Sequence, residues 1–280
     1  MAKESINREY KDRLFKYIFG NEKHKDLTLS LYNAINNTHY DCIDDIEITT
    51  IENAVYMGMH NDLSFIIADS MNIYEQQSTY NPNMPLRMLV YTGQLYAKLL
   101  ETEEKDDVVY NSTVIPLPYP KLIVFYNGDR FQPDKTELKL SDAFREGAKG
   151  DIQVKVTMLN VNYGRNMKLL RRCRPLSDYS LFTTTVRELK RKNKNKTTEE
   201  AVEETLKLLP NDSEVKKLIQ ENKAAVAKMF LFEYDEKAVL EAQKKDAIEK
   251  VAKIMIKDNV PFEKISKYTE IPIEELKKLN

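Results

Sequence analysis

Two carboxylates and one amide lie close together in the segment NDLSFIIADSMNIYEQQS, residues 61–78: Asp62, Glu75 and Gln77. Strands usually contain few Asp and Glu residues, so acidic side chains in this segment need an explanation. Neighbouring carboxylates repel each other unless a proton or a cation lies between them. Oxygen donors of this type suit Mg²⁺, which takes one or two carboxylates and completes its shell with water or phosphate oxygen. The segment is therefore either an ordinary polar hairpin face or a site for a divalent cation.

Alternating apolar and polar residues on both sides of a short polar stretch predict a β-hairpin. A four-residue turn at 68–71 places Asp62 opposite Gln77 and Ser64 opposite Glu75. Directly opposed residues of an antiparallel pair share one face of the sheet. The three candidate side chains therefore converge on one patch. A register slip of one residue would move one strand's set to the other face.

The rest of the first half of the chain predicts the scaffold for this hairpin. We expect helices before Gly20 and around residues 27–35, strands at Ile46–Asn53, Leu122–Tyr126 and Ile152–Tyr163, and a helix that starts near Asn83. The continuous apolar run at Leu122–Tyr126 is typical of a strand that is buried on both faces. This order of elements predicts an α/β fold in which helices pack on a mixed sheet.

After residue 163 the pattern becomes helical. Thr197 and Glu200 form a capping-box pattern, Asp212 is expected to cap a further helix, and the chain from Ala247 contains three short amphipathic segments of helix-turn-helix size. We therefore expect a core at residues 1–165, a helical extension at 166–245 and a small helical segment at 246–280.

Composition limits the partners and the compartment. The formal net charge is only −1, so a polyanion must be met by a local patch rather than by bulk charge. Cys42 and Cys173 fit reduced thiols and have no zinc-site spacing. The charged start MAKESINREYKDRL is unlike a signal peptide, and no apolar run is long enough to cross a membrane. We expect a cytoplasmic protein without a membrane partner.

Six motifs, in this order, carry a family resemblance: DRLFKYIFG, NDLSFII with NIYEQQS, NPNMPLR, VFYNG, VTMLNVNYG and FEYD. Together they resemble the Rpn family of recombination-promoting nucleases and transposase-like proteins, which belongs to the PD-(D/E)XK nuclease superfamily. The resemblance implies a restriction-endonuclease-like αβββαβ core and a Mg-dependent DNA endonuclease linked to recombination or to mobile elements. Asp62 matches the metal-binding Asp of the family, Glu75 the Glu of its E-x-Q motif, and Gln77 the Gln that replaces the usual Lys. Gln76 departs from the family, where this position is commonly His.

The expected mechanism assigns roles to these residues. Asp62 and Glu75 would hold Mg²⁺, which polarises the scissile phosphate and lowers the pKa of a bound water. Gln77 would orient that water or contact phosphate, since an amide is no base at neutral pH. Lys16 and Arg87 are candidates for substrate binding, or long side chains that lie along the sheet surface.

Asp12 and Glu22 are candidates for a further metal contact, or ordinary surface carboxylates. Basic clusters at 165–174 and 190–196, the second expected in a loop, could follow a DNA backbone or form a solvated face. The helical regions are expected to join subunits into a homo-oligomer, such as a dimer, or to act as a lid. The alternative function is a catalytically weak DNA-binding or oligomeric interaction protein with a degenerate nuclease fold.

Overall fold

The computed structural model describes residues 14–50, 61–102, 110, 112–145, 148, 150–193, 195–258 and 260–277, with the backbone alone over 231–247. The chain forms two compact units, Met1–Phe230 and Leu231–Asn280. The division falls inside the stretch 166–245 that the sequence predicts as a helical extension. All candidate site residues belong to the first unit.

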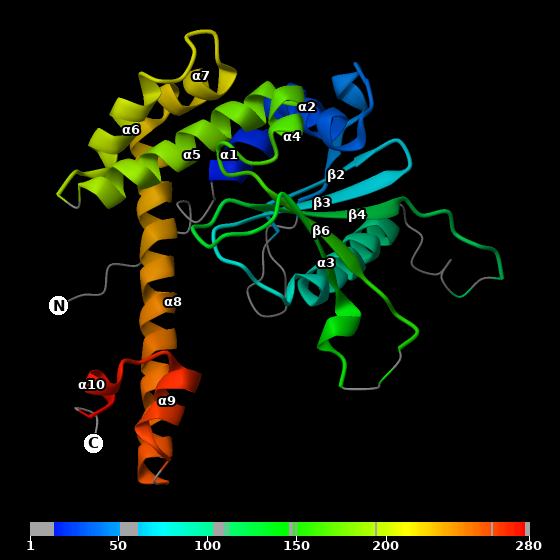
Figure 1. Cartoon of the computed structure of the whole chain (residues 1–280). Coiled ribbons are helices and arrows are strands. Elements are labelled where there is room, and N and C mark those ends of the chain that lie inside the picture. The colour runs from blue at the N-terminus through cyan, green and yellow to red at the C-terminus, as the bar shows by residue number, and fades with distance from the viewer. Residues whose placement is uncertain are drawn as a thin grey trace, which may run out of the picture. The chain divides into compact units, whose positions relative to one another are not determined.

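A six-stranded mixed sheet forms the centre of the first unit, with strand order β1-β2-β3-β4-β6-β5 (Figure 1). The strands are β1 (Glu47–Ile48), β2 (Leu63–Ile67), β3 (Ser70–Gln77), β4 (Tyr119–Tyr126), β5 (Lys135–Lys139) and β6 (Lys155–Asn160). Strands β1, β2 and β3 pair in antiparallel fashion, β3, β4 and β6 are parallel, and β5 is antiparallel to β6. The predicted mixed α/β class is confirmed.

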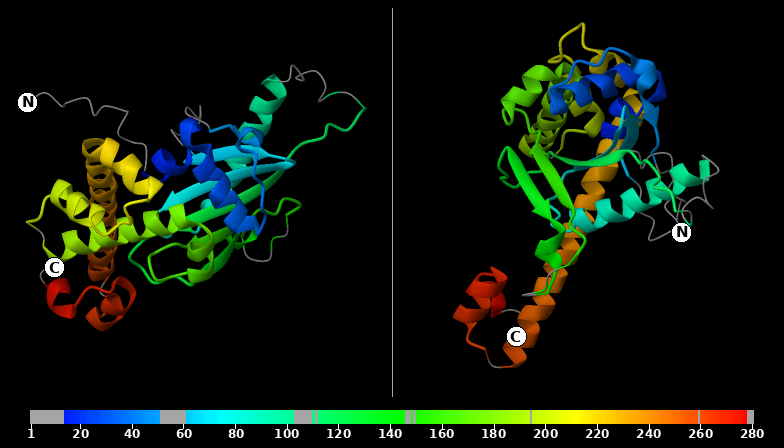
Figure 2. Two further views of the ribbon diagram at one scale, coloured as in Figure 1. Left: turned by 90° about the horizontal axis from the view of Figure 1, so that it is seen from above. Right: turned by 90° about the vertical axis from the view of Figure 1, so that its right-hand side faces the viewer.

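Helices cover both faces of this sheet (Figures 1 and 2). The helices that the structure describes, over both units, are α1 (Leu14–Phe19), α2 (Lys25–Asn36), α3 (Met84–Thr102), α4 (Met167–Arg172), α5 (Arg174–Lys192), α6 (Thr198–Leu206), α7 (Glu214–Glu221), α8 (Lys223–Lys257), α9 (Phe262–Thr269) and α10 (Ile273–Leu276). Helix α3 connects the parallel strands β3 and β4, as a parallel pair requires. Among the described residues, no helix has the length and apolar character that a membrane span needs.

Each face of the sheet has its own hydrophobic core. On one face, Ile73 and Val124 pack with Met84, Met88 and Tyr91 of α3. On the other face, the helices α1, α2, α4 and α5 contribute to a larger core. An aromatic series crosses that second core, with ring centroids 4.9 Å apart for Phe15 and Phe125 and 5.4 Å apart for Tyr74 and Phe125. The face on which a strand residue lies therefore decides which of two separate environments it meets.

Several predicted boundaries in the sheet are wrong. The strand expected at Ile152–Tyr163 is limited to β6, and Ile152 is exposed. The edge strand β5 was not predicted, because its sequence KTELK alternates charged residues with only one fully buried apolar residue. Strand β1 is two residues long, and residues 51–53 of the strand expected at Ile46–Asn53 lie outside the described residues.

The helical half also differs in part. The capping box of Thr197 and Glu200 is confirmed, since each side chain accepts a hydrogen bond from the other residue's backbone N–H. Ser213, not Asp212, caps α7, because the Asp212 carboxylate binds Arg174 instead. That ion pair lowers the pKa of Asp212. The first of the three short C-terminal helices is the end of the 35-residue α8, whereas α9 and α10 are short helices.

The two cysteines are expected to react very differently. Cys42 is exposed, whereas burial raises the pKa of Cys173 to about 11. We expect one thiol to react rapidly with an aromatic disulfide reagent at pH 8, and a second only after denaturation, because the thiolate is the nucleophile. Two rapidly reacting thiols in the native protein would contradict the burial of Cys173, and Cys42→Ser should remove the fast phase.

The same shift links stability to pH. The folded pKa of Cys173 lies above its ordinary value of 9.0, so the protonated thiol favours the folded state. This contribution is complete below pH 9 and is lost as the pH rises towards 11.

Candidate functional site

The hairpin of β2 and β3 is tighter than its sequence predicts. Ile67 pairs with Ser70, so the turn contains only Ala68 and Asp69, and Ala68 has a positive φ of 48°. The four-residue turn is therefore wrong. The true register, continued from the pair Leu63–Tyr74, places Asp62 opposite Glu75 rather than opposite Gln77.

The error is two residues, and the period of a strand is two, so the predicted faces are unchanged. Glu75 and Gln77 share a face with Ile73, which packs in the core beneath α3. Asp62 lies on the same face, since it is opposite Glu75. The structure thus brings the three candidate residues together on the side of the sheet that α3 covers.

Glu75 is the most deeply buried of the three, with a side chain 1% exposed. Its Oε1 accepts a hydrogen bond from Nη2 of Arg87 at 3.1 Å, and this Nη2 also donates to the Tyr91 hydroxyl at 2.7 Å. Arg87 and Tyr91 lie one turn apart on α3 and face the sheet. Burial and the Glu75 carboxylate raise the pKa of Tyr91, and their effect exceeds the opposite effect of Arg87. The phenol therefore stays protonated at neutral pH.

Asp62 is held from the side of β3. Its Oδ2 accepts a hydrogen bond from the backbone N–H of Gln76 at 2.7 Å, and the residue is 9% exposed. A carboxylate that accepts a backbone N–H is fixed in orientation before any ligand arrives. This hydrogen bond joins the two segments of the hairpin beyond their last pair, Leu63–Tyr74, and it directs the Asp62 carboxylate towards β3.

Gln77 completes the group through its amide. With the amide oriented so that its nitrogen donates to the Thr79 carbonyl at 3.1 Å, its oxygen accepts from Nη1 of Arg87 at 2.9 Å. Both amide groups are then satisfied, which is the criterion for assigning such side chains. In this orientation one guanidinium contacts both Glu75 and Gln77. The sequence predicts that Arg87 binds substrate. In the structure its guanidinium contacts Glu75, the candidate metal ligand.

Two other predicted site residues, Lys16 and Glu22, belong to the first two helical segments that the structure describes. Lys16 is on α1, whose apolar residues Phe15 and Phe19 pack on the opposite face of the sheet. Glu22 is exposed and pairs with Lys25 at 3.3 Å. Asp12 lies outside the described residues.

Gln76, between the two site residues on β3, faces the other core. Its Nε2 donates to Oδ1 of Asn127 at 2.6 Å, and Nδ2 of Asn127 donates to the Tyr179 hydroxyl at 3.2 Å. Gly128 follows directly, and a Cβ at this position would lie 2.1 Å from the Ser78 carbonyl oxygen. The VFYNG motif thus locks the end of β4 to the end of β3. The sequence predicts that Asn127 and Gly128 end the buried strand, because an Asn-Gly pair is a signal of a tight turn, but it does not predict these contacts.

A hollow of about 300 Å³ opens at the carboxyl ends of β4 and β6. Four arginines line it: Arg130, Arg165, Arg187 and Arg191, together with Asp129 and Glu188. We call it the arginine hollow. Sequence reasoning grouped Arg165 with the basic run 165–174 and Arg191 with 190–196, and the fold brings these two together. Residues 190–192 are the last turn of α5, so the loop predicted for the second run is wrong there.

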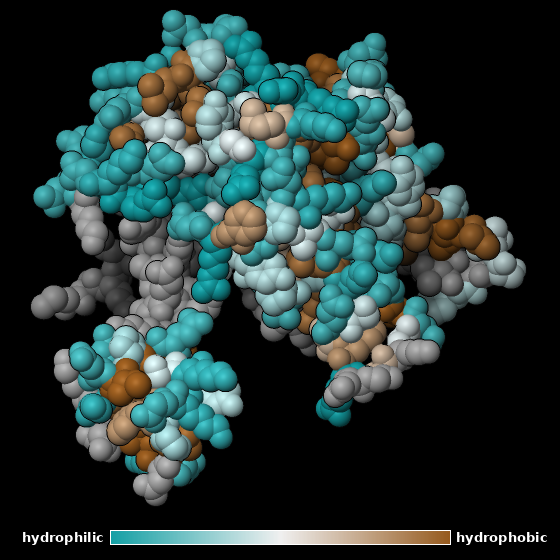
Figure 3. Space-filling view, viewed as in Figure 1, coloured by the Kyte–Doolittle hydropathy of each residue, from teal (hydrophilic) through white to brown (hydrophobic). Residues whose placement is uncertain are grey.

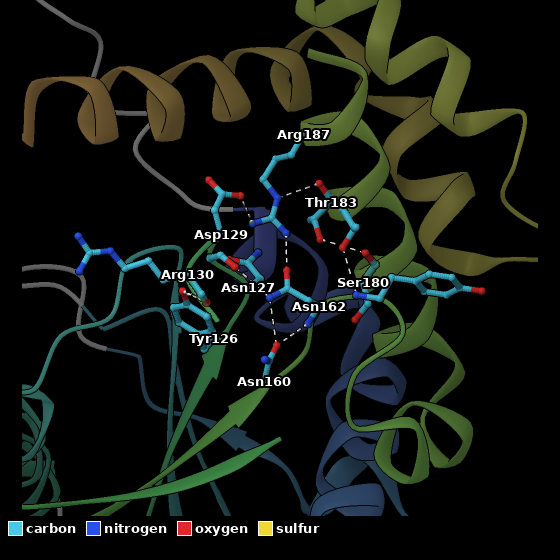
Figure 4. Close-up of polar contacts among 12 residues, drawn as sticks. Tyr126, Asn127, Asp129, Arg130, Asn160, Asn162, Ser180, Thr183 and Arg187 are labelled. Carbon is cyan, nitrogen blue, oxygen red and sulfur yellow. Dashed lines mark hydrogen bonds and ion pairs between the residues drawn. The ribbon is translucent and has the colours of Figure 1, made fainter. Parts of the chain in front are cut away.

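Asparagines of the VTMLNVNYG motif organise the floor of this hollow (Figure 4). Nδ2 of Asn162 donates to Oδ1 of Asn160 and to the Gly128 carbonyl, both at 3.0 Å, and Oδ1 of Asn162 accepts from Arg187 at 2.7 Å. Arg187 also lies 3.8 Å from Asp129. The guanidinium is therefore fixed by neutral and acidic partners, and it presents a pre-oriented cation at the strand ends.

The arginine hollow and the three hairpin residues lie at one edge of the sheet. Gln77 pairs with Tyr126, and Tyr126 pairs with Asn160. Gln77, Tyr126 and Asn160 therefore form one row across β3, β4 and β6. Neighbouring strands are about 4.8 Å apart, which places Asn160 roughly 10 Å from Gln77 along the row. Ligands of parallel sheets commonly bind at this carboxyl edge.

Comparison with known proteins adds no relative: no family model, no curated protein and no solved structure matches this chain.

Proposed function

We propose that this protein is a Mg-dependent endonuclease that hydrolyses phosphodiester bonds in DNA. The observation that carries the proposal is the register of β2 and β3, which, continued by one residue from the pair Leu63–Tyr74, brings Asp62 opposite Glu75, with Gln77 on the face of Glu75. Two acids opposite each other have little structural use in a sheet, since like charges there are destabilising. A cation between them removes that cost.

The order of elements supports the same assignment. Helix α2, strands β1, β2 and β3, helix α3 and strand β4 follow each other in the αβββαβ order that the family resemblance implies. The two carboxylates then fall at the second and third strands, as the resemblance to the PD-(D/E)XK superfamily requires. The resemblance also supplies the link to DNA recombination or mobile elements.

The donor set fits Mg²⁺ rather than a soft metal. Within the described residues no cluster of three His, Cys, Asp or Glu side chains could hold a metal by protein ligands alone. Mg²⁺ does not need one, because it is commonly bound through one or two carboxylates plus water and substrate phosphate. Asp62 and Glu75 would hold it.

Each residue then has a defined task. When bound, Mg²⁺ supplies Lewis-acid activation of the phosphate and of a water molecule. Asp62, fixed by the Gln76 N–H, keeps its carboxylate directed at β3. Arg87 neutralises Glu75 and orients the Gln77 oxygen. The superfamily pattern has a lysine at the position of Gln77, and here Arg87 brings the positive charge to that place from α3.

The arginine hollow supports DNA as the substrate. Arg130 and Arg165 are exposed at its rim, and Arg187 is fixed in its floor. Phosphate contacts from such side chains position a duplex without reading its sequence. A backbone that follows the carboxyl edge of the sheet from Gln77 to Asn160 would pass from the candidate metal site to this hollow.

The direct test is cleavage of supercoiled plasmid with Mg²⁺, with EDTA as the metal-free control. Nicked or linear product that needs Mg²⁺ supports the proposal. Absence of cleavage over a range of DNA substrates and of Mg²⁺ and Mn²⁺ concentrations would overturn it.

A second candidate function is a DNA-binding or interaction protein whose nuclease site is degenerate. The ion pair of Arg87 with Glu75 favours it, because a guanidinium already compensates the buried carboxylate. Calorimetric titration with Mg²⁺ separates the two functions. A protein that binds DNA but gives no Mg²⁺ signal, with or without Asp62→Ala, belongs to the second class.

Gln77 gives a sharper test of the chemistry. We expect Gln77→Ala to lower the cleavage rate by roughly 10²-fold, a usual loss for one well-placed polar group. Mg²⁺ affinity should change little, because both carboxylates remain. Gln76→Ala is the matched control: it removes the neighbouring amide from the other face, so stability should fall while the cleavage rate per folded molecule is retained. Equal rates in Gln77→Ala and the parent would remove Gln77 from the mechanism.

The C-terminal unit supports a proposal of self-association. Ile248, Val251 and Ile254 of α8 are 41%, 51% and 59% exposed, and apolar side chains reach the surface of this unit (Figure 3). Their spacing of three residues places them on one stripe of the helix. We propose that this stripe contributes to a homo-oligomer.

A further inference from the structure

A second hollow, of about 440 Å³, lies on the face of the sheet opposite to the candidate metal site. Five basic side chains line it: Lys121, Lys135 and Lys155 from the sheet, and Lys168 and Arg172 from α4. We call it the lysine hollow. Lys121 and Lys155 alternate with residues of the α3 core, so they point to the side of α2 and α4.

The strand register places like charges side by side. Ile123 pairs with Thr157, and the same register continued by two residues brings Lys121 beside Lys155. Lys155 pairs in turn with Lys139 of β5. Three lysines therefore lie in one row across neighbouring strands, an arrangement that destabilises a sheet unless an anion compensates it.

In its described part, the protein does not provide that anion for Lys121 and Lys155. No Asp or Glu lines the lysine hollow, and none of its five basic residues forms an ion pair with a described residue. Glu137 lies on the same sheet face, but its carboxylate is engaged by Lys139 at 3.5 Å. In contrast, the arginine hollow contains Asp129 and Glu188.

The lining selects the chemical class of the partner. The polar residues Asn36, Thr157 and Asn166 line the hollow together with the lysines, and no aromatic residue lines it. Protein–protein hot spots are typically built from aromatic and Arg anchors, so an acidic protein is a poor match. Flexible lysines act as point charges that suit phosphates. A backbone with a phosphate at every step can meet several of them at once.

We propose that the lysine hollow binds the phosphate backbone of nucleic acid as a site separate from the candidate cleavage site. Along β4, Lys121 precedes Tyr126, the neighbour of Gln77, by five residues, or roughly 17 Å, and it points to the other face of the sheet. The two places face opposite sides of the sheet, so they would contact different segments of nucleic acid. The protein therefore holds a second segment of the same molecule or a second molecule.

The proposal does not depend on catalysis and can be tested in EDTA. The measurement is fluorescence anisotropy of a labelled 30-bp duplex of mixed sequence at several salt concentrations. The variant is Lys121→Ala/Lys155→Ala/Arg172→Ala. Its control, Lys207→Ala/Lys217→Ala/Lys223→Ala, removes the same charge from exposed positions at the end of α6 and on α7 and α8.

We expect the hollow variant to weaken binding about tenfold or more at 0.1 M salt. Its plot of log affinity against log salt should be less steep by roughly 0.9 for each phosphate that the variant no longer neutralises. The control should keep the parent's slope. The same weakening in both variants would reduce the effect to net charge and overturn the site, as would unchanged binding in the hollow variant.

Two further measurements complete the test. Polyglutamate that displaces the duplex as well as unlabelled DNA does at equal charge concentration would overturn the choice of nucleic acid. Asp62→Ala should retain the lysine-hollow contribution to binding, so a failed nuclease proposal leaves this one standing. A loss of the salt slope in Asp62→Ala would contradict the separation of the two sites.

Discussion

Asp62→Asn is expected to lower Mg-dependent plasmid cleavage by roughly 10³-fold or more while the fold is retained. The amide keeps an oxygen that can accept the N–H of Gln76, so the hairpin contact survives. What it loses is the negative charge that, in our proposal, would hold the metal. Several kcal/mol of transition-state stabilisation go with the loss of a metal ligand, and each 1.36 kcal/mol corresponds to a factor of ten in rate.

The matched control is Asp69→Asn, which makes the same chemical change in the same hairpin. Asp69 is exposed in the two-residue turn, and its backbone carbonyl accepts a hydrogen bond from the N–H of Tyr119. We expect parental cleavage from this variant. Cleavage rates are compared after far-UV circular dichroism has verified that each variant is folded. If Asp62→Asn cuts as fast as Asp69→Asn, the carboxylate pair is not the site.

Arg87→Ala is expected to cause the largest loss of stability among the site variants, about 2–3 kcal/mol. Removing one partner of a buried ion pair leaves an uncompensated charge, which typically costs 3–5 kcal/mol, and the partial exposure of Arg87 reduces that figure. The Gln77 oxygen and the Tyr91 hydroxyl lose a donor at the same time. Urea unfolding followed by far-UV circular dichroism measures the effect, since the chain has no Trp.

A double variant separates charge from packing. Glu75→Gln combined with Arg87→Met keeps the volume of both side chains and removes both charges. We expect it to regain more than half of the stability that Arg87→Ala loses, because no buried charge remains. A double variant as unstable as Arg87→Ala would show that packing, and not the ion pair, is the main contribution of Arg87.

Mg²⁺ should act differently on the two proteins. If Asp62 and Glu75 hold the ion, Mg²⁺ stabilises Arg87→Ala, in which both carboxylates remain, by mass action. It should not stabilise the double variant to the same extent, since Glu75 is replaced there. Equal Mg²⁺ effects on both would remove Glu75 from the metal site.

The sequence predicts the faces of the hairpin better than its pairs. Alternation together with a turn of even length places Asp62, Glu75 and Gln77 on one side, and a turn miscounted by two residues does not change that result. Which residue stands opposite Asp62 depends on the turn itself. Ala68 adopts a left-handed backbone conformation, which is unusual for alanine. The number of residues in the turn can therefore not be predicted from the residue types.

Other features depend on tertiary structure and cannot be predicted from the sequence. The contact of Arg87 with Glu75 requires the angle at which α3 crosses the sheet. The lysine hollow combines residues from α2, three strands and α4, and only the strand order brings Lys121 beside Lys155. The basic run at 165–174 was visible, but the fold divides it: Arg165 lines one hollow, and Lys168 and Arg172 line the other.

The candidate metal site has a further property that concerns how it forms. Its contacts join residues that are close in sequence: Asp62 and Gln76 are 14 positions apart, and Glu75 and Arg87 are 12 apart. The loops that must close are short, so their entropic cost is small, and hairpin and helix can meet early in folding. The lysine hollow, which joins α2 to β4, β5, β6 and α4, requires the completed sheet. A folding intermediate that contains only the hairpin and α3 would therefore already possess the two carboxylates, while it would still lack the proposed nucleic-acid site on the other face of the sheet.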